Sequence, residues 1–294
     1  MNGQGKLLTH FLKNADKLVI PVYQRNYDWK EEHCKKLYSD LVKTVREGKR
    51  WHFFGGIVSV SDPMGSSSDY LVIDGQQRIT TVSLLLLAIA NLVKAGIVTP
   101  KDPNLYDVIT KKYLVDEINP KQRKMKLKPI KGDQDSYDRL WGDPSEYNQS
   151  SRITQNYLYF YNQIQRDDIS VDQLFSAVEK LQIIDFTLTP PDDDPQLVFE
   201  SLNSTGLDLN EGDKIRNFVL MRRSMEEQEQ FYDDYWSPIE KNAGYDKQTN
   251  SYDVSPFIRD YLGIKERRLT AMKEIYQEFK DYVEKRGRIE DVLK

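Results

Sequence analysis

The stretch Tyr70–Ala90, YLVIDGQQRITTVSLLLLAIA, constrains the fold more than any other part of the 294-residue chain. It opens with Leu71-Val72-Ile73, a short apolar run that predicts a buried strand. Asp74-Gly75 then breaks the strand, and an apolar helical stretch follows. A strand that turns on glycine into a helix directs backbone N–H groups and the positive end of the helix dipole toward one point. The stretch therefore predicts an anion site at a strand–helix junction.

The side chains at this junction suit a phosphate group. Arg78 falls in the first helical turn, where its guanidinium offers a fork of donors. Thr80 and Thr81 add hydroxyls, and Asp74 can hold a metal ion directly or through water. The structural alternative is an arginine that pairs with Asp74 only to stabilise the junction. The residue types of this stretch leave both interpretations open.

Charge and composition limit the class of protein. The formal net charge is −4, so a nucleic-acid surface would have to be a local basic patch. The one cysteine, Cys34, excludes an internal disulfide framework and fits a reducing cytoplasm. The N-terminus lacks the apolar core of a signal peptide, and the longest apolar run, Leu84–Ala88, is too short to cross a bilayer. We therefore expect a cytoplasmic protein with no membrane partner.

The histidines exclude several kinds of active site. There are three, His10, His33 and His52, and none has metal-ligand spacing with cysteine. A zinc site, a Ser–His–Asp triad and a nuclease of the His–Asn–His type are therefore not expected. The sequence also has no G-x-x-x-x-G-K-[ST] loop and no G-x-G-x-x-G after a strand.

Hydrophobic periodicity predicts an α+β fold with a small mixed sheet and a mainly helical remainder. Strands are expected at residues 17–20, 53–60, 71–73 and 183–188. Helices are expected after Gly75 and at residues 30–47, 152–166, 171–181, 197–202, 225–242, 254–262 and 269–285. Asn210 is expected to cap a further helix, with Asp213 at its third position. We expect residues 1–100 to form a nucleotide-binding core and residues 101–294 a mainly helical portion that completes the same domain.

Three further segments allow two interpretations each. Aromatic residues interleaved with Gln24 and Arg25 in residues 20–30 can stack on bases, or they can simply pack at the edge of a core. The glycine pair Gly55-Gly56 marks a place where a backbone or a ligand comes close. Lys121–Lys131 has a basic face with a period of two, which fits a DNA-facing ribbon or an edge strand protected by lysines.

Four separated segments together resemble a known family. IPVYQRNYDW, FFGGIV, VIDGQQRITTVSLL and FESLNSTGLDLNEGDKIRN, in this order, resemble the N-terminal domain of GmrSD-type restriction endonucleases. SPFIRDYLGIK and EIYQEFKDY also resemble its closing helices. The resemblance implies a ParB/sulfiredoxin-like fold in the first part of the chain. It also implies a role in anti-phage defence.

The resemblance implies an activity and partners. Residues 74–78, the DGQQR segment, would bind and hydrolyse a nucleoside triphosphate (GTP, ATP or UTP) with Mg²⁺. The segment around Tyr-Gln-Arg would lie near that site and sense modified phage DNA, such as a phosphorothioate backbone. Its expected DNA-sensing residues are Pro21, Tyr23, Gln24, Arg25, Tyr27 and Trp29. The family's C-terminal nuclease domain, with its histidine, is not within these 294 residues. We therefore expect a nuclease domain or subunit as a partner, and a homodimer is one arrangement to consider.

The expected roles combine the resemblance with the chemistry of the residues. Asp74 would hold the metal, Gln76 or Gln77 would position the attacking water, and Arg78 with Arg25 would hold phosphates. Either glutamine could instead support the site from behind. The remaining expected nucleotide-binding residues are Gly75, Thr80, Thr81, Asn203, Thr205, Gly206 and Lys214, with Asp213 or Lys214 behind the Asn-Ser-Thr-Gly loop.

Two other functions remain open. The same arginine-rich site can grip backbone phosphate in a DNA-binding module without turnover, since a fold alone does not decide function. A metal-dependent nuclease would instead use carboxylates such as Asp74, Asp185 or Asp213. Its drawback is that no carboxylate–lysine pair follows a strand with convincing spacing.

Overall fold

The computed structural model describes residues 3–61, 69–116, 124–166, 168–189, 192–203, 210–221, 223, 225–246, 251–252 and 254–293. Contacts divide the chain into two compact units. The first unit comprises Met1–Pro21 and Asn26–Asp193, and the second comprises Val22–Arg25 and Asp194–Lys294. Four residues near the N-terminus, 22–25, therefore belong to the second unit, although the rest of that unit begins only at Asp194.

The first unit is built on a mixed six-stranded sheet in the order β1-β8-β3-β4-β2-β7. β8 runs parallel to β3, and β2 runs parallel to both β4 and β7, whereas the β1–β8 and β3–β4 pairs are antiparallel. The strands are β1 (Gly3–Leu7), β2 (Lys17–Val19), β3 (His52–Ser61), β4 (Asp69–Asp74), β7 (Leu127–Lys128) and β8 (Leu181–Leu188). The expected α+β class with a mixed sheet is confirmed.

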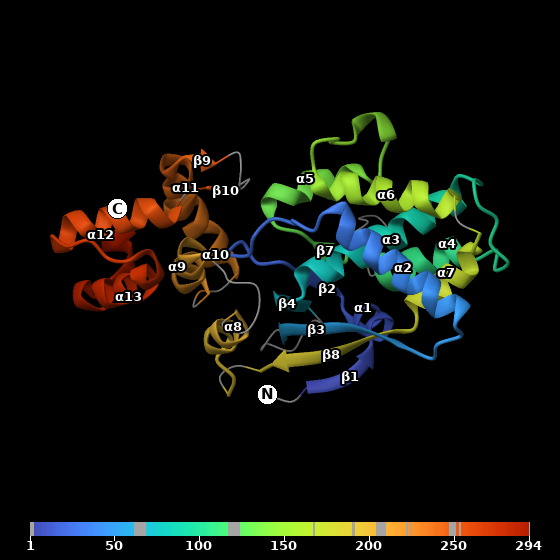
Figure 1. Ribbon diagram of the computed structural model, residues 1–294, viewed down its shortest axis with the longest axis horizontal. Helices are drawn as coiled ribbons and strands as arrows, with labels where there is room; N and C mark the ends of the chain where they lie inside the picture. The colour runs from blue at the N-terminus through green and yellow to red at the C-terminus, as the bar shows by residue number, and fades with distance from the viewer. Residues whose placement is uncertain are drawn as a thin grey trace. The chain divides into compact units, whose positions relative to one another are not determined.

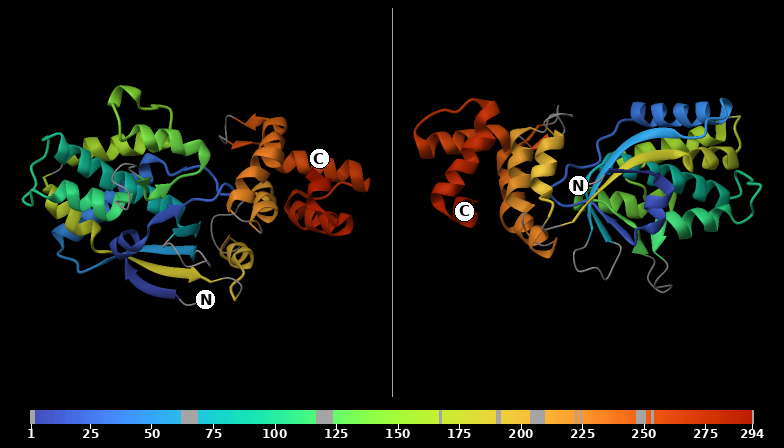
Figure 2. Two further views of the ribbon diagram at one scale, coloured as in Figure 1. Left: turned by 180° about the vertical axis from the view of Figure 1, so that it is seen from behind. Right: turned by 90° about the horizontal axis from the view of Figure 1, so that it is seen from below.

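Helices of the first unit gather on one face of this sheet (Figures 1 and 2). The helices are α1 (Leu8–Asn14), α2 (Glu31–Arg46), α3 (Gln76–Lys94), α4 (Leu105–Ile109), α5 (Lys131–Arg139), α6 (Arg152–Arg166) and α7 (Val171–Val178). A π-helical turn η1 (Thr110–Leu114), a 3₁₀ turn η2 (Pro144–Glu146) and a two-stranded ribbon of β5 (Val115–Asp116) and β6 (Lys124–Met125) complete the unit.

Helix α3 forms the centre of the core. Its residues from Leu84 to Ala90 have no exposed surface, and they share one hydrophobic cluster with Ile57 of β3 and Ile183 of β8. A helix that is apolar on all sides must be covered on all sides. By length and composition α3 could span a membrane, but 83% of its most apolar window is buried inside the protein. The helix is therefore accounted for as a core element.

The sequence located eight elements of this unit within a few residues, namely β2, α2, β3, β4, α3, α6, α7 and β8. It did not locate β1, α1, α4 or α5. Helix α2 buries Cys34, Leu37 and Leu41 as expected, and Gly48 follows it with φ of +63°. Burial raises the pKa of the Cys34 thiol to about 12. Helix α7 is shorter than predicted, because the chain turns after Val178 and β8 already begins at Leu181.

The basic stretch around residue 126 folds differently from either of its two simple interpretations. β7 is an edge strand and Lys128 is exposed, so the edge interpretation holds there. Lys126, however, is buried, and its ammonium donates to the carbonyls of Leu12, Lys13 and Lys112 at 3.0–3.2 Å. Since the Lys126 ammonium is bonded to backbone carbonyls inside the protein, it is not part of a DNA-facing basic surface among the described residues of this stretch, 124–131.

The second unit is mainly helical. Its elements are α8 (Pro195–Asn203), α9 (Glu211–Leu220), α10 (Met225–Phe231), a π-helical turn η3 (Tyr232–Trp236), α11 (Ser237–Ala243), β9 (Tyr245–Asp246), β10 (Ser251–Tyr252), α12 (Val254–Glu266), a 3₁₀ turn η4 (Met272–Glu274), α13 (Ile275–Arg286) and α14 (Ile289–Leu293). Asn210 caps α9 as expected, since its Oδ1 accepts from the backbone N–H of Asp213 at 2.8 Å. The helix predicted over residues 225–242 is interrupted by η3.

The packing does not separate residues 1–100 from the rest. β8 pairs with both β1 and β3, and α3 packs against α6, so residues on both sides of position 100 share one core. The compact units divide instead at Asp193, after β8. Whether nucleotide binding is confined to the first hundred residues stays a prediction.

Asp133 provides a test of the core by titration. Burial raises the pKa of this carboxyl to about 6, although its Oδ2 accepts from the backbone N–H of Tyr27 at 2.6 Å. Between pH 4 and 6 the folded chain keeps a proton that the unfolded chain releases, so this group's contribution to stability falls as the pH rises.

We therefore expect Asp133→Asn, which keeps an acceptor for Tyr27 but does not titrate, to flatten the pH dependence of stability across this window. Above pH 6 it should raise the free energy of unfolding by up to about 3 kcal/mol. Urea unfolding of both proteins at pH 4, 5, 6 and 7 measures this difference. Parallel curves for the two proteins would contradict the assignment.

Candidate phosphate site at the start of helix α3

Gly75 shapes the turn between β4 and α3. It is the N-cap of α3 and has φ of +94°, a conformation that other residues rarely adopt. A Cβ at this position would lie 3.0 Å from Cγ1 of Ile57 and 3.1 Å from the carbonyl oxygen of Gly56. The N–H groups of the first helical turn, from Gln76 to Arg78, have no acceptor four residues earlier within the helix. The turn therefore has the donor-rich form that the sequence predicts.

Arg78 lies across the glycine pair of β3. Its Nη1 donates to the carbonyl of Gly56 at 3.1 Å, and the guanidinium lies so close to Gly55 that a Cβ there would be 2.6 Å from Nε. The ion pair with Asp74 is long, at 3.8 Å, with side chains that are 32% and 51% exposed for Arg78 and Asp74. An exposed pair of this kind contributes little to stability, so pairing with Asp74 does not by itself explain the arginine.

Two β-bulges flank the glycine pair. The pairing of β3 with β8 shifts between Phe53 and Gly55, and its pairing with β4 shifts between Val58 and Ser59. Bulges bend a strand and redirect its side chains. A close approach is found at Gly55, but the approaching group is the side chain of Arg78 and not the backbone or ligand that the glycine pair predicts.

Gln77 faces the preceding segment of the chain. Its Oε1 accepts from the backbone N–H groups of Asp28 and Trp29 at 3.0 and 3.1 Å, and its Nε2 donates to the carbonyl of Asn26 at 3.2 Å. The side chain is 8% exposed. In this structure the amide thus supports the backbone of residues 26–29, which agrees with the expectation that either glutamine could support the site from behind. The catalytic role of Gln77 stays a prediction.

The two threonines are also buried. Thr81 has no exposed surface, and its hydroxyl bonds to the carbonyl of Gln77 and to the hydroxyl of Tyr27, both at 2.7 Å. Thr81 is therefore a core residue in this structure, and its role in nucleotide binding stays a prediction. Thr80 and Gln76 are buried as well, with 4% and 9% exposed. Their roles stay predictions.

The aromatic residues predicted to sense DNA pack inside the protein. Tyr27 is 5% exposed, its hydroxyl bonds to Thr81 and Asn156, and burial raises its pKa well above the usual value. The Trp29 ring stacks on His33 with centroids 5.3 Å apart. Stacking of bases on Tyr27 would require the segment to leave the core. The packing interpretation therefore accounts for these two rings.

The first half of the same segment packs in the second unit. Tyr23 is 1% exposed and its ring meets Phe199 edge-on, and Gln24 is 8% exposed. Pro21 is also buried, whereas Arg25 is half-buried. Burial raises the pKa of Tyr23. Of the residues predicted to sense DNA, Arg25 is the charged one with exposed surface.

The other predicted nucleotide-binding residues belong to the second unit or fall outside the described residues. Thr205, Gly206 and the side chain of Asn203 lie outside them. Lys214 forms an ion pair with Glu211 at 2.7 Å, and Asp213 binds Arg216 at 2.8 Å. Their part in nucleotide binding stays a prediction.

Carboxylates do not cluster at this site. Among the residues that the structure describes, no group of three or more His, Cys, Asp or Glu could hold a metal ion. Asp185 is buried, forms an ion pair with Lys6 and accepts from Thr187 at 3.3 Å. Because Asp185 and Asp213 are each paired with a cation, Asp74 is the one of the three proposed carboxylates that is exposed and loosely paired.

Three residues that bond to the segment Tyr23–Trp29 were not identified from the sequence. Asn156 on α6 donates to the Tyr27 hydroxyl and to the Trp29 carbonyl, Asp133 accepts from Tyr27, and Arg216 donates to the Tyr23 carbonyl. Asn156 is a single amide on an otherwise apolar helical face, and Asp213 and Arg216 have ion-pair spacing on a helix. These patterns point to structural roles but do not reveal the backbone partners.

Comparison with known protein families identifies the family of this chain. Residues 8–220 match the family described as "GmrSD restriction endonuclease, N-terminal domain". The match covers more than half of the chain, and the chain belongs to this family. It is thus related to restriction endonucleases, enzymes of defence whose substrate is DNA. No curated protein matches the chain.

The close approach of Arg78 to β3 can be tested with neighbouring glycines. Gly55 has φ of +121° and no room for a Cβ, whereas a Cβ on Gly56 would meet atoms no nearer than 3.8 Å. We expect Gly55→Ala to destabilise the protein by about 1–3 kcal/mol more than Gly56→Ala, as measured by urea unfolding.

A double variant separates backbone strain from the clash with the guanidinium. Gly55→Ala should cost less in an Arg78→Ala background, because the obstructing side chain is then gone. Equal costs for the two glycine variants would rule out the geometry described for this turn.

Proposed function

We propose that this domain binds a nucleoside triphosphate at the start of α3 and hydrolyses it, as the sensor of a restriction endonuclease that acts on modified DNA. The observation that carries the proposal is the half-exposed guanidinium of Arg78, which is fixed over Gly55 beside the N-terminal turn of a 19-residue helix. A cation and several backbone N–H groups directed at one point suit a phosphate chain.

The backbone and the side chains of the turn would have different roles in phosphate transfer. Backbone N–H groups of the first helical turn would bind phosphate oxygens, while Arg78 would stabilise the charge that develops as the terminal phosphate leaves. Phosphate transfer to water depends on positioning and charge stabilisation more than on a covalent nucleophile. The absence of a Ser–His–Asp pattern in the sequence is therefore compatible with this chemistry.

Asp74 fits the metal requirement of such a reaction. Its carboxylate is half-exposed, it directly precedes the glycine cap, and its pairing with Arg78 is loose. Mg²⁺ usually binds one or two carboxylates together with substrate phosphates and water, so a cluster of protein ligands is not required. Mg²⁺ would neutralise the negative charge of the phosphates when it is bound.

The remaining roles are proposed on the resemblance of the sequence. Gln76 or Gln77 would orient the attacking water, as expected from the sequence. Arg25, Asn203, Thr205, Gly206 and Lys214 are retained as proposed nucleotide contacts on the resemblance of the sequence alone. We further propose a ParB/sulfiredoxin-like fold for the first part of the chain, a cytoplasmic location, and a nuclease domain or subunit as partner.

A DNA-binding module without turnover is the second candidate, because Arg78 and Arg25 are equally suited to backbone phosphate. It predicts affinity for DNA that falls steeply with salt and no phosphate release with any triphosphate. A nuclease carried by this chain itself receives no support from the described residues, since Asp185 and Asp213 are engaged by Lys6 and Arg216.

Arg78→Ala tests the proposed function. We expect it to lower the rate of phosphate release from the preferred triphosphate by at least about a hundredfold, since it removes a charge that stabilises the transition state. Phosphate release with Mg²⁺ and each of GTP, ATP and UTP measures turnover, and equilibrium binding of a non-hydrolysable analogue measures affinity.

Arg139→Ala is a matched control. Arg139 is an exposed arginine of α5 whose Nε binds Asp135, four residues earlier, as Arg78 pairs with Asp74. The control should leave turnover and binding unchanged. Full turnover and full affinity in Arg78→Ala would remove the turn as the nucleotide site.

A further inference from the structure

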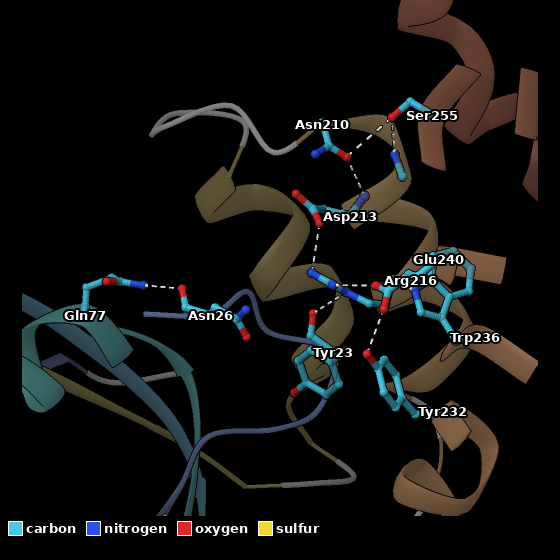
Figure 3. Close-up of polar contacts among 11 residues, drawn as sticks. Tyr23, Asn26, Gln77, Asn210, Asp213, Arg216, Tyr232, Trp236, Glu240 and Ser255 are labelled. Carbon is cyan, nitrogen blue, oxygen red and sulfur yellow. Dashed lines mark hydrogen bonds and ion pairs between the residues drawn. The ribbon is translucent and has the colours of Figure 1, made fainter. Parts of the chain in front are cut away.

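The residues Tyr23–Trp29 are held at two places by side chains from different units (Figure 3). In the second half of this segment, the amide of Gln77 binds the backbone at Asn26, Asp28 and Trp29. Gln77 is the second residue of α3 and immediately precedes Arg78. The side chain that fixes this half therefore comes from the turn proposed to bind phosphate.

Other side chains hold the same half against movement. The backbone N–H of Tyr27 donates to Asp133 of α5, and its hydroxyl bonds to Thr81, one helical turn beyond Gln77. Asn156 of α6 donates to both the Tyr27 hydroxyl and the Trp29 carbonyl, at 2.9 and 2.6 Å. Residues 26–29 are thus bonded to α3, α5 and α6 together, and Gln77 is the one of these partners that lies in the first turn of α3.

Arg216 of α9 fixes the first half of the segment in the second unit. Its Nε donates to the carbonyl of Tyr23 at 2.9 Å, while the Tyr23 ring is buried against Phe199. The guanidinium is oriented by Asp213 at 2.8 Å and by Glu240 at 3.0 Å (Figure 3).

Glu240 is itself held in place. Its carboxylate accepts from the Tyr232 hydroxyl at 2.7 Å and from the Trp236 indole at 3.0 Å. Arg216 and Glu240 are both largely buried, with side chains 12% and 7% exposed. A buried arginine with two carboxylates and a backbone carbonyl has a strongly preferred orientation, so the Tyr23 carbonyl has a well-defined donor on α9.

Only Gln24 and Arg25 separate the two anchored carbonyls, those of Tyr23 and Asn26. We propose that Tyr23–Trp29 is a tether that couples the nucleotide site at the start of α3 to helix α9, with Gln77 and Arg216 as its positioning residues. This proposal rests on the proposed function for its ligand, a nucleoside triphosphate. Phosphate bound at the turn would restrict the motion of the first turn of α3. Through the bonds of Gln77, this would restrict the motion of the tether and, through Tyr23, of Arg216 and α9.

Hydrogen exchange of backbone amides tests the tether. A non-hydrolysable triphosphate with Mg²⁺, at saturation, should slow exchange at Tyr23–Gln24 and in α9 by about tenfold in the wild-type protein, a typical size for coupling between sites. Gln77→Leu, which removes all three anchoring bonds, should abolish this remote effect at saturation. Gln77→Glu, which keeps both accepted bonds, should restore most of it.

Matched controls separate the tether from general loss of structure. Gln165→Leu removes an exposed amide on α6 that donates to the carbonyl of Tyr161, and it should leave the remote protection intact. Arg216→Lys should weaken triphosphate binding in return, because coupling is reciprocal. Arg259→Ala, which breaks the exposed pair with Asp260, should not.

The outcomes distinguish this proposal from the proposed function. If triphosphate binds but protection in α9 is absent, or persists in Gln77→Leu, the tether is overturned and the nucleotide site stands. If no triphosphate binds, the proposed function fails, and the nucleotide-free proteins decide the tether. Faster exchange of α9 amides in Gln77→Leu than in Gln165→Leu then supports it, and equal exchange overturns it.

Discussion

The complete burial of residues 79–90 of α3 limits where this domain can be polar. The helix is apolar around its whole circumference and is surrounded by the sheet and by neighbouring helices, so its length offers no surface for chemistry. Its N-terminal turn is the exception, because helix geometry leaves the first N–H groups without internal partners. Asp74 and Arg78 are the exposed charges at that turn, and the glycines at 55 and 75 make the space that the turn requires.

The geometry of this helical turn explains why Gln77 and Arg78 have such different surroundings. Gln77 and Arg78 are adjacent, but a step of one residue along a helix rotates the side chain by about 100°. Gln77 consequently faces the backbone of residues 26–29, whereas Arg78 faces the glycine pair of β3. One turn of helix thus supplies both a cation for a ligand and a support for a distant segment of chain.

The sequence predicted the fold well where local patterns decide it. The strand at 71–73, the glycine cap, α6 and the cap at Asn210 all follow from periodicity and capping chemistry. The site was predicted less completely, because the partners of Gln77, Thr81 and Tyr27 are backbone groups and hydroxyls far away in the sequence. Such partners leave no local pattern, and a buried tyrosine and a base-stacking tyrosine look identical in a sequence.

Residues 22–25 belong to the second unit, while the residues on either side of them belong to the first. This arrangement affects the order in which contacts can form as the ribosome synthesises the chain. Gln77 emerges from the ribosome 51 residues after Asn26, whereas Arg216 emerges 193 residues after Tyr23. At typical rates of translation, roughly 10–40 seconds pass between the synthesis of Tyr23 and that of Arg216. The bond from Gln77 to Asn26 can therefore form while residues up to Arg216 are still being synthesised. The bond from Arg216 can form only later, to a segment whose other half is already held in place.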